Sequence, residues 1–475
     1  MTRALTLSPS PLATAPPRAS RFLFVALATA AASFSLLQSL VTPVLPKIQH
    51  DLHTSQGTVT WVLTAWLLSA AVATPIMGRI GDMYGKRRTL LVALAAIAAG
   101  CLIAAAAPSV GVLIVGRVVQ GLGGAVFPIS FGILRDELPP ARVPSAIGGL
   151  SAVIAVGGGL GVVLAGPVAG ALDWRALFWI PAVVVAGTAL LTLRFVRESP
   201  VHGRERGRGR INWPAGVLLS AWLVALILPL SKAPAWGWTS ARVVGPLLLA
   251  LALAAAWVLV ELRSAEPLID MQMMRLPAVW TTNLVSLLFG AGMFATYAFL
   301  PQFLQTPRST GYGFGTTVTG AGLAMLPMLV TMAVAGSVSG PLTAFVSSKV
   351  QLLIGTATAA VSCAGLTLFH DAYWQVAVAT GAFGVGLGLT FTAMVNLIVA
   401  TVPAGQTAVA SGMNANIRTI GGSVGAAVAS AVITAHETPA GLPLETGYTY
   451  AFAVLTAMLA TAAVIATLVP RARKA

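Results

Sequence analysis

Fourteen apolar runs, each about as long as a helix that crosses a lipid bilayer, make up most of this 475-residue chain. A crossing helix needs roughly 20 predominantly apolar residues. The segments between the runs are too short to hold a soluble domain. We therefore predict an all-α integral membrane protein with 14 transmembrane helices. The runs lie near residues 22–46, 58–79, 89–107, 110–134, 145–172, 176–195, 213–231, 243–261, 279–304, 316–342, 350–368, 373–401, 406–434 and 447–469.

The distribution of charge supports this class of protein and predicts its orientation. Charged residues make up only 9% of the chain, against about 25% in soluble domains. The net charge of +15 does not indicate a nucleic acid partner, because the bases are scattered between apolar runs. The side that holds both termini carries 21 of the 28 Lys and Arg residues. Cytoplasmic loops are enriched in these residues, so we expect a multi-pass protein of the plasma (inner) membrane with both termini in the cytoplasm.

The runs and linkers divide the chain into five segments. The linker RESPVHGRERGRGRIN is favoured as a solvated connector, and contact with anionic lipid stays open as an alternative. The expected segments are a disordered cytoplasmic tail (1–20), an N-terminal six-helix bundle (21–195), a basic cytoplasmic loop (196–212), two inserted helices (213–262) and a C-terminal six-helix bundle (279–470).

A short internal repeat supports two related halves. GRIGDMYGKRRTLLV at 78–92 aligns without gaps with GPLTAFVSSKVQLLI at 340–354, so that Gly78 matches Gly340 and Arg87 matches Lys349. The two copies follow the second and the tenth runs, as they would if two helices were inserted between equivalent halves. Related halves with a binding site between them are a transporter architecture.

The residues of the first copy of the repeat indicate a role beyond setting the membrane topology. Gly78 and Gly81 remove side chains from the end of the second run, which permits close helix packing. Asp82 lies at the membrane edge, where a carboxylate can face the N–H groups of a helix N-terminus. The bases at 86–88 are expected to stay in the cytoplasm. A purely topogenic turn would explain these bases but neither the acid nor the glycines.

Several motifs together resemble the major facilitator superfamily, over residues 40–469. GRIGDMYGKRR resembles its loop motif, and LIVGRVVQGLGGAVFP (113–128) resembles its helix 4 motif. GVVLAGPVAG (161–170) is similar to the helix 5 motif of exporters. EPLIDMQMM (266–274) and ASGMNANIRTIGGSVGAA (410–427) are similar to segments of the 14-helix drug:proton antiporter branch. The resemblance implies the major facilitator fold, with two six-helix halves and two inserted central helices.

The resemblance also implies roles for two of these motifs. Gly78, Asp82, Gly85 and Arg87 would form a conformational latch that holds the halves together in the outward-open state, with Asp82 facing the thirteenth run near 405–407. In the helix 5 motif, Pro167 should kink the helix, while Gly161, Gly166 and Gly170 should permit close packing. Position 171 is Ala, where the family usually has a second Gly. A generic membrane-helix kink is the alternative interpretation.

One acid that the antiporter branch usually carries is missing. Its first helix typically has an Asp at the position of Leu37 and an Asn at that of Thr42. All 13 acids and all five histidines fall in loops or at the ends of the runs. Arg117 and Arg418 therefore lie within the membrane without an acid to pair with. Placing one charged side chain at that depth costs a free energy of roughly 3 kcal/mol. We expect backbone carbonyls and the amides of residues 120, 414 and 416 to solvate them.

Polar residues inside the runs are the candidates for a substrate cavity. For Arg117, the alternative is a structural role that locks its helix in place. The cavity candidates are Gln38, Thr42, Arg117, Gln120, Asn283, Tyr297, Asn396, Asn414 and Arg418. Any proton carrier must then sit at a membrane edge. The coupling candidates are Asp51, Asp136, Glu137, His370 and Asp371.

Other functional classes find little support. Cys101 and Cys363 lie in apolar runs and are expected to be buried free thiols, and no spacing indicates a metal site or another cofactor. No P-loop pattern indicates a primary pump. An intramembrane enzyme would need a His or paired carboxylates at membrane depth, and we expect no enzymatic activity. A receptor or scaffold stays open, although the two-half pattern argues against it.

The sequence therefore predicts a secondary active exporter. We expect it to move small amphipathic compounds, such as drugs or secondary metabolites, by alternating access and as a monomer in the bilayer. Proton antiport is implied by the resemblance. The alternative is an uncoupled or weakly coupled exporter of a lipid or an anionic metabolite. Two buried guanidiniums without carboxylates favour neutral or anionic substrates over cations.

Overall fold

The structure, a computed structural model, describes residues 17–198, 211–438 and 443–470. It is helical over these residues, apart from one isolated β-bridge between Glu437 and Pro443. Fourteen segments are long and apolar enough to cross a membrane, which confirms the predicted all-α class and helix count. Most of the expected tail and of the basic loop lies outside the described residues.

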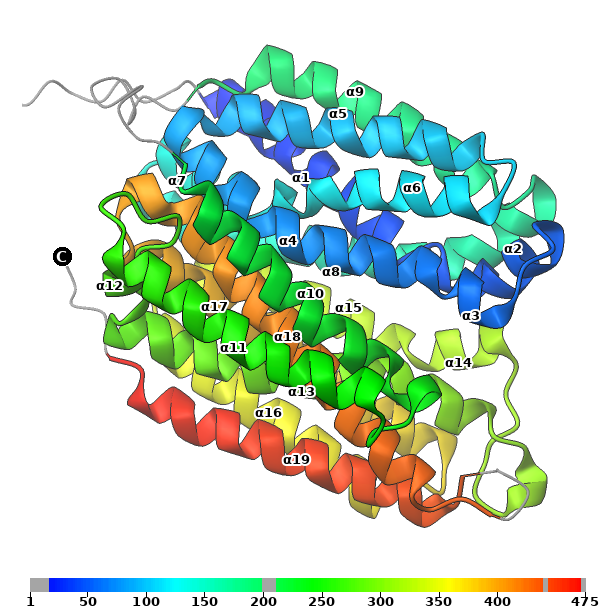
Figure 1. Ribbon diagram of the computed structural model, residues 1–475. Coiled ribbons are helices and arrows are strands. Elements are labelled where there is room, and N and C mark those ends of the chain that lie inside the picture. Colours follow the sequence, from blue (N-terminus) through cyan, green and yellow to red (C-terminus); the bar gives the residue numbers. More distant parts are fainter. Residues whose placement is uncertain (1–16, 199–210, 439–442, 471–475) are drawn as a thin grey trace, which may run out of the picture.

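The first six crossing segments form one half of the molecule, drawn in blue to teal in Figure 1. Two crossings, Arg21–Asp51 and Val110–Glu137, each combine two helices separated by a short 3₁₀ turn. The helices of this half are α1 (Pro17–Ser39), α2 (Leu45–Asp51), α3 (Gln56–Val59), α4 (Trp61–Tyr84), α5 (Lys86–Ala105), α6 (Val110–Gly121), α7 (Val126–Glu137), α8 (Val143–Ala171) and α9 (Ala176–Phe195).

The last six crossing segments form the other half, drawn in light green to red, and two further crossings join the halves. The joining segment consists of α10 (Trp213–Trp236), α11 (Ala241–Arg263) and the short α12 (Met271–Met274). The second half consists of α13 (Pro277–Gln305), α14 (Val318–Ala324), α15 (Leu326–Leu342), α16 (Ser348–Leu368), α17 (Tyr373–Thr401), α18 (Thr407–Thr434) and α19 (Glu445–Leu468).

Each half buries its own apolar core and exposes apolar side chains around its outside. Phe34 and Leu94 lie in the core of the first half, and Phe289 and Phe383 in that of the second. Large aliphatic side chains such as Val183 on α9 are exposed on the outer surface. In water such an exposed apolar belt would be costly, whereas lipid tails are as apolar as the side chains. This arrangement explains how so few charged residues suffice.

The halves meet along two seams, which the internal repeat relates to each other. In the first seam α4 packs on α18, and a Cβ at Gly78 would lie 2.9 Å from the carbonyl oxygen of Ala408. In the second seam α15 packs on α8, and a Cβ at Gly340 would clash with the backbone of Ser145. Gly78 and Gly340 are thus equivalent in space as well as in sequence. Both of these contacts lie at the end where the chain carries most of its bases, which we call the basic end.

The inserted helices cover only the first seam. Leu219 and Leu223 of α10 share an apolar core with Ala71 of α4 and with Val409 of α18. At the end opposite the basic end, Lys232 Nζ donates to Thr60 Oγ1 at 2.7 Å. The second seam has no such covering helix in the described part of the chain, so the two seams differ in their exposure to lipid.

Candidate functional site

A buried carboxylate joins the two halves at the basic end of the first seam. Asp82, in the last turn of α4, accepts hydrogen bonds from the backbone N–H groups of Ala408 at 3.3 Å and Val409 at 2.9 Å. These groups lie in the first turn of α18, where backbone N–H groups have no partner within the helix. The positive end of the helix dipole also favours an anion there. The sequence predicted the partner at 405–407, but a 3₁₀ turn at Ala404–Gln406 shifts the first free N–H groups to 408 and 409.

Lys86 is buried within this junction, a role that the sequence did not predict. Its side chain is 0% exposed, and Nζ lies 2.7 Å from Asp136 Oδ2 and 3.5 Å from Asp82 Oδ1. Nζ also donates to the carbonyl oxygen of Ala404 at 3.3 Å. Two carboxylates and a carbonyl compensate the lost hydration of the ammonium, which makes its burial tolerable. The absence of a side chain at Gly132 leaves room for the lysine stem.

The remaining predicted latch residues shape the turn. Gly85 has φ of +116°, a left-handed conformation that favours glycine. A Cβ there would also collide with Glu198. Arg87 Nη2 donates to the carbonyl oxygen of Leu193 at 2.7 Å, which fastens the turn to α9. Arg135, which precedes Asp136, donates to Thr407 Oγ1 at 2.6 Å and adds a second contact between the halves.

Arg117 is fully buried in the first half and is solvated mainly by backbone. It donates to the carbonyl oxygens of Val62 at 3.1 Å and Leu37 at 3.3 Å, and to Gln120 Oε1 at 2.8 Å. Its guanidinium carbon lies 5.2 Å from the ring centroid of Trp66. The predicted solvation by carbonyls and Gln120 is confirmed. Leu37, where an acid was expected, supplies its backbone oxygen in place of a carboxylate.

Arg418 has a different environment from the one predicted. Its guanidinium carbon lies 4.5 Å from the ring centroid of Phe391 on α17. Asn414 instead donates to Asn283 Oδ1 at 2.9 Å, and Asn416 donates across the first seam to the carbonyl oxygen of Ala71 at 2.6 Å. Neither amide solvates Arg418, because one binds α13 and the other binds α4.

The other cavity candidates are spread over several environments. Gln38 is half-buried, and Thr42 is exposed in the turn that follows α1. The Tyr297 hydroxyl lies 3.7 Å from Met332 Sδ. Asn396 is buried on α17, and its Nδ2 has no hydrogen-bond partner within the described residues. These four residues do not form one cluster with the arginines through any bond in the described part of the chain.

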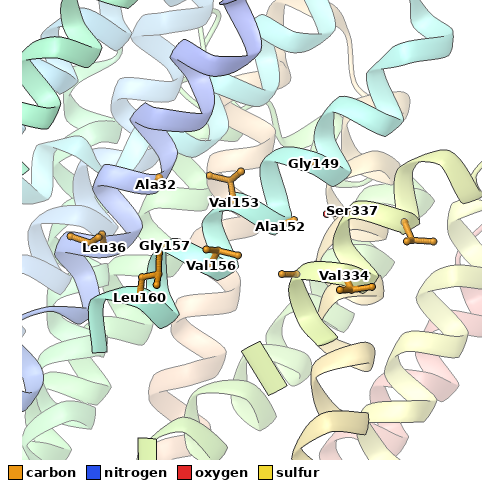
Figure 2. A pocket seen from close by; sticks show the side chains of 12 residues that line it. Ala32, Leu36, Gly149, Ala152, Val153, Val156, Gly157, Leu160, Val334 and Ser337 are labelled. Carbon is orange, nitrogen blue, oxygen red and sulfur yellow. The ribbon is translucent and has the colours of Figure 1, made fainter. Parts of the chain in front are cut away.

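The clearest pocket lies at the second seam, between α1, α8 and α15 (Figure 2). Its volume is about 500 Å³, and its lining is apolar except for Ser337. None of the predicted cavity residues lines it. Small residues such as Gly149 and Ala152 make the hollow, and Val156, Leu160 and Val334 are exposed at its edge. A second groove of about 820 Å³ lies along α10 and α11, between Trp213 and Trp236.

The helix 5 motif lies in α8, beside this seam. The helix continues through Pro167 to Ala171. Gly161 packs against α1, where a Cβ would lie 2.8 Å from the carbonyl oxygen of Leu36. Nothing lies within 4 Å of a Cβ at Gly166 or Gly170. The predicted close packing is therefore correct only for Gly161, because Gly166 and Gly170 lie on the exposed face of α8, opposite the buried Ala165 and Ala169.

The coupling candidates lie at both ends of the molecule. Asp136 is in the buried junction, and its neighbour Glu137 is half-buried at the end of α7. Asp51 is near the opposite end, 3.2 Å from His50 Nδ1. His370 and Asp371 lie at that end too, beside Glu445, a residue that sequence reasoning missed. No local spacing could have indicated it, since Glu445 follows His370 by 75 positions.

Comparison with known proteins identifies the family. The model of the Major Facilitator Superfamily matches residues 27–426 and again 282–475. The tetracenomycin C resistance and export protein of Streptomyces glaucescens is 30% identical, over 85% of this chain and 74% of that protein. The cephamycin export protein of Amycolatopsis lactamdurans is also 30% identical, over 91% of this chain and 89% of that protein.

Solved structures agree on the fold. A human organic anion transporter superposes with a TM-score of 0.69 at 16% identity, over 95% of this chain and 100% of that one. A proton:xylose symporter superposes with a TM-score of 0.67 at 12% identity, over 95% of this chain and 96% of that one. Fourteen crossing segments, two halves that meet through Asp82 and these matches lead to one conclusion: the chain belongs to the major facilitator superfamily.

Proposed function

We propose that the protein is a secondary active exporter of small amphipathic compounds that works by alternating access. The observation that carries this proposal is the junction at the basic end, where Asp82 of one half binds two N–H groups of the other. These bonds are few, so the junction suits halves that separate in each cycle. The names of the related proteins, which are resistance and export proteins, support an exported drug or secondary metabolite.

The basic end is proposed to face the cytoplasm of a cell whose plasma membrane holds the protein. The excess of Lys and Arg at this end supports that orientation. Closure of the basic end then corresponds to the outward-open state, in which the latch of Asp82, Gly78, Gly85 and Arg87 holds the halves together.

Neutral or anionic substrates are proposed, because the interior offers buried cations and few anions. Arg418 is buried and has a ring rather than a carboxylate as its neighbour. Arg117 is held by carbonyls. An arginine can bind a carboxylate through two parallel hydrogen bonds, whereas a cation would meet uncompensated repulsion.

Proton coupling is proposed to run through the junction itself. Lys86 lies between two buried carboxylates, those of Asp82 and Asp136, at the end of the molecule where the halves would separate. When the basic ends part, these carboxylates meet water and can bind or release a proton. Asp136 is the candidate carrier. The absence of an acid at position 37 favours the second candidate function, an uncoupled exporter of a lipid or anionic metabolite.

Flux in proteoliposomes tests both functions. We expect a fluorescent neutral amphipath to move faster than in protein-free liposomes, and to move faster still under a proton gradient. Gradient-independent flux would support the uncoupled exporter. Equal flux with and without protein would contradict export altogether.

A further inference from the structure

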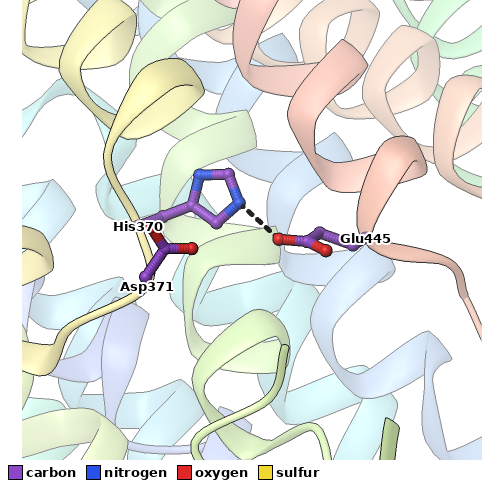
Figure 3. A group of neighbouring side chains, drawn as sticks. All are labelled: His370, Asp371 and Glu445. Carbon is purple, nitrogen blue, oxygen red and sulfur yellow. Dashed lines mark hydrogen bonds and ion pairs between the residues drawn. The ribbon is translucent and has the colours of Figure 1, made fainter. Parts of the chain in front are cut away.

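Three possible metal ligands from distant parts of the sequence meet at the end opposite the basic end. His370 and Asp371 follow α16, and Glu445 begins α19 (Figure 3). One ligand atom from each of the three lies within 4.8 Å of the others. We propose that His370, Asp371 and Glu445 form a binding site for a zinc ion. This proposal does not depend on the substrate or on the coupling of transport.

A backbone carbonyl prepares the imidazole for a metal. His370 Nδ1 lies 2.8 Å from the carbonyl oxygen of Leu366. Because a carbonyl only accepts hydrogen bonds, Nδ1 must carry the hydrogen, which leaves the lone pair of the neutral ring on Nε2. Metal-binding histidines commonly fix their second nitrogen in this way. The ring is therefore oriented with its free nitrogen toward Glu445, and Asp371 lies beside it (Figure 3).

The distance between Nε2 and Glu445 requires a cation. Nε2 lies 3.1 Å from Glu445 Oε1, so a lone pair faces a carboxylate oxygen. Either a proton or a metal ion must lie near this contact. In a tetrahedral zinc site with bonds of about 2.0–2.1 Å, neighbouring ligand atoms lie about 3.3 Å apart. His370 and Glu445 already match this spacing, and a rotation of the exposed Asp371 side chain brings in the third ligand.

Aromatic side chains support the cluster. His370 is only 8% exposed, and the ring of Phe303 lies edge-on with centroids 5.5 Å apart. Tyr448, one turn after Glu445, packs on the same phenylalanine ring. Among the described residues, neither carboxylate forms an ion pair with Lys or Arg. The C-terminal end of α16 adds partial negative charge and the N-terminal end of α19 adds partial positive charge, so the two carboxylates supply the net charge that favours a cation.

The ligand set indicates zinc rather than magnesium or calcium. Imidazole suits zinc, whereas magnesium and calcium prefer oxygen ligands alone. Three protein ligands leave a fourth position for water. A bound ion would join the end of α16 to the start of α19, both in the second half. It would therefore stabilise that half without restraining the movement of the halves against each other.

Another pair of residues provides a matched control within the same chain. His436 also donates from Nδ1 to the carbonyl oxygen four residues earlier, that of Val432 at 2.8 Å, and Glu437 follows it as Asp371 follows His370. No third ligand residue completes a cluster there in the described part of the chain. His436→Ala should therefore leave zinc binding unchanged.

The test is zinc binding to the purified, metal-free protein, measured by calorimetry and by the zinc-dependent shift in unfolding temperature. We expect one ion per chain, no competition from magnesium, and a loss of affinity of roughly tenfold or more in Glu445→Gln and His370→Ala. X-ray absorption should show one imidazole nitrogen among oxygen ligands. Absence of binding at micromolar zinc, or equal binding in Glu445→Gln, would overturn the site and leave a proton between His370 and Glu445.

Discussion

At the scale of single residues, the first seam depends on charges whose partners lie far away in the sequence. Asp82 was recognisable because it stands alone in an apolar region beside two glycines. Lys86 was not recognisable as buried, because its burial depends on Asp136, 50 positions later, and on Ala404 in the other half. A charge pattern predicts which residues are unusual, whereas their solvation is a property of the assembled fold.

Replacing Asp82 tests the junction between the halves. Asp82→Asn keeps the size of the side chain but removes the charge that faces the N-terminus of α18. In a partly buried geometry this contact contributes up to about 2 kcal/mol, so the closed basic end should lose up to about thirtyfold in relative population. We expect normal amounts in the membrane and a reduced flux in proteoliposomes.

A control for this change is Asp173→Asn. Asp173 also accepts a backbone hydrogen bond, from Trp174 at 2.7 Å, but its hydrogen bonds stay within its own turn. It should transport normally. Unchanged flux in Asp82→Asn would remove the latch from the mechanism.

Adding the missing acid tests the coupling. Leu37 is buried, and its carbonyl oxygen already accepts from Arg117. Leu37→Asp places a carboxylate close to this guanidinium, where it gains a counter-ion and a protonation equilibrium. We expect the dependence of flux on the proton gradient to increase. Leu37→Asn, of equal size and without charge, should leave that dependence as it is, and the same response in both variants would refute the idea.

At the scale of helices, the fold was largely predictable because length and hydropathy are local properties. The fourteen spans follow from runs of about 20 apolar residues, and the repeat around Gly78 and Gly340 indicated two related halves, whereas the second seam became visible only in the structure. The candidate cavity was less predictable. Asn414 and Asn416 are two positions apart on one helix, so their side chains point to different neighbours, α13 and α4. Only the packing of the helices decides whether either of them approaches Arg418.

Filling the glycine contact at the second seam should hold the basic ends apart. A side chain at Gly340 would clash with the backbone of Ser145, and such overpacking typically costs 1–3 kcal/mol. In Gly340→Val we expect a folded protein with several-fold lower flux. Gly170→Val is the matched control, since nothing lies within 4 Å of that position. If Gly340→Val and Gly170→Val reduced flux equally, the loss of flux would come from the helix propensity of valine and not from the contact at the seam.

At the scale of the whole molecule, the two seams have diverged although they are related by the repeat. The first carries a buried acid and is covered by α10. In the second, Ala344 stands at the position equivalent to Asp82, and an apolar pocket lies between the helices. The inserted helices thus protect the charged seam from lipid and leave the uncharged seam exposed to it.

The charge of the whole interior predicts substrate selectivity. At an effective dielectric near 20, one guanidinium about 8 Å away costs a cation roughly 2 kcal/mol, a factor of about thirty in affinity. We expect neutral and carboxylate-bearing amphipaths to bind more tightly than a dicationic dye of similar size. In Arg418→Gln the preference for the anion should disappear. Tightest binding of the dication by the unmodified protein would contradict this prediction.

The second copy of the repeat has Ala344 at the position that Asp82 occupies in the first copy. This difference also determines how freely each copy can accumulate mutations. The first copy must preserve a carboxylate, the lysine that neutralises it and the glycine that turns the chain. The second copy retains one steric requirement, the missing side chain at Gly340. Saturation mutagenesis under drug selection should therefore find residues 341–347 permissive and residues 78–88 intolerant. A duplicated segment would then evolve at two different rates within one protein.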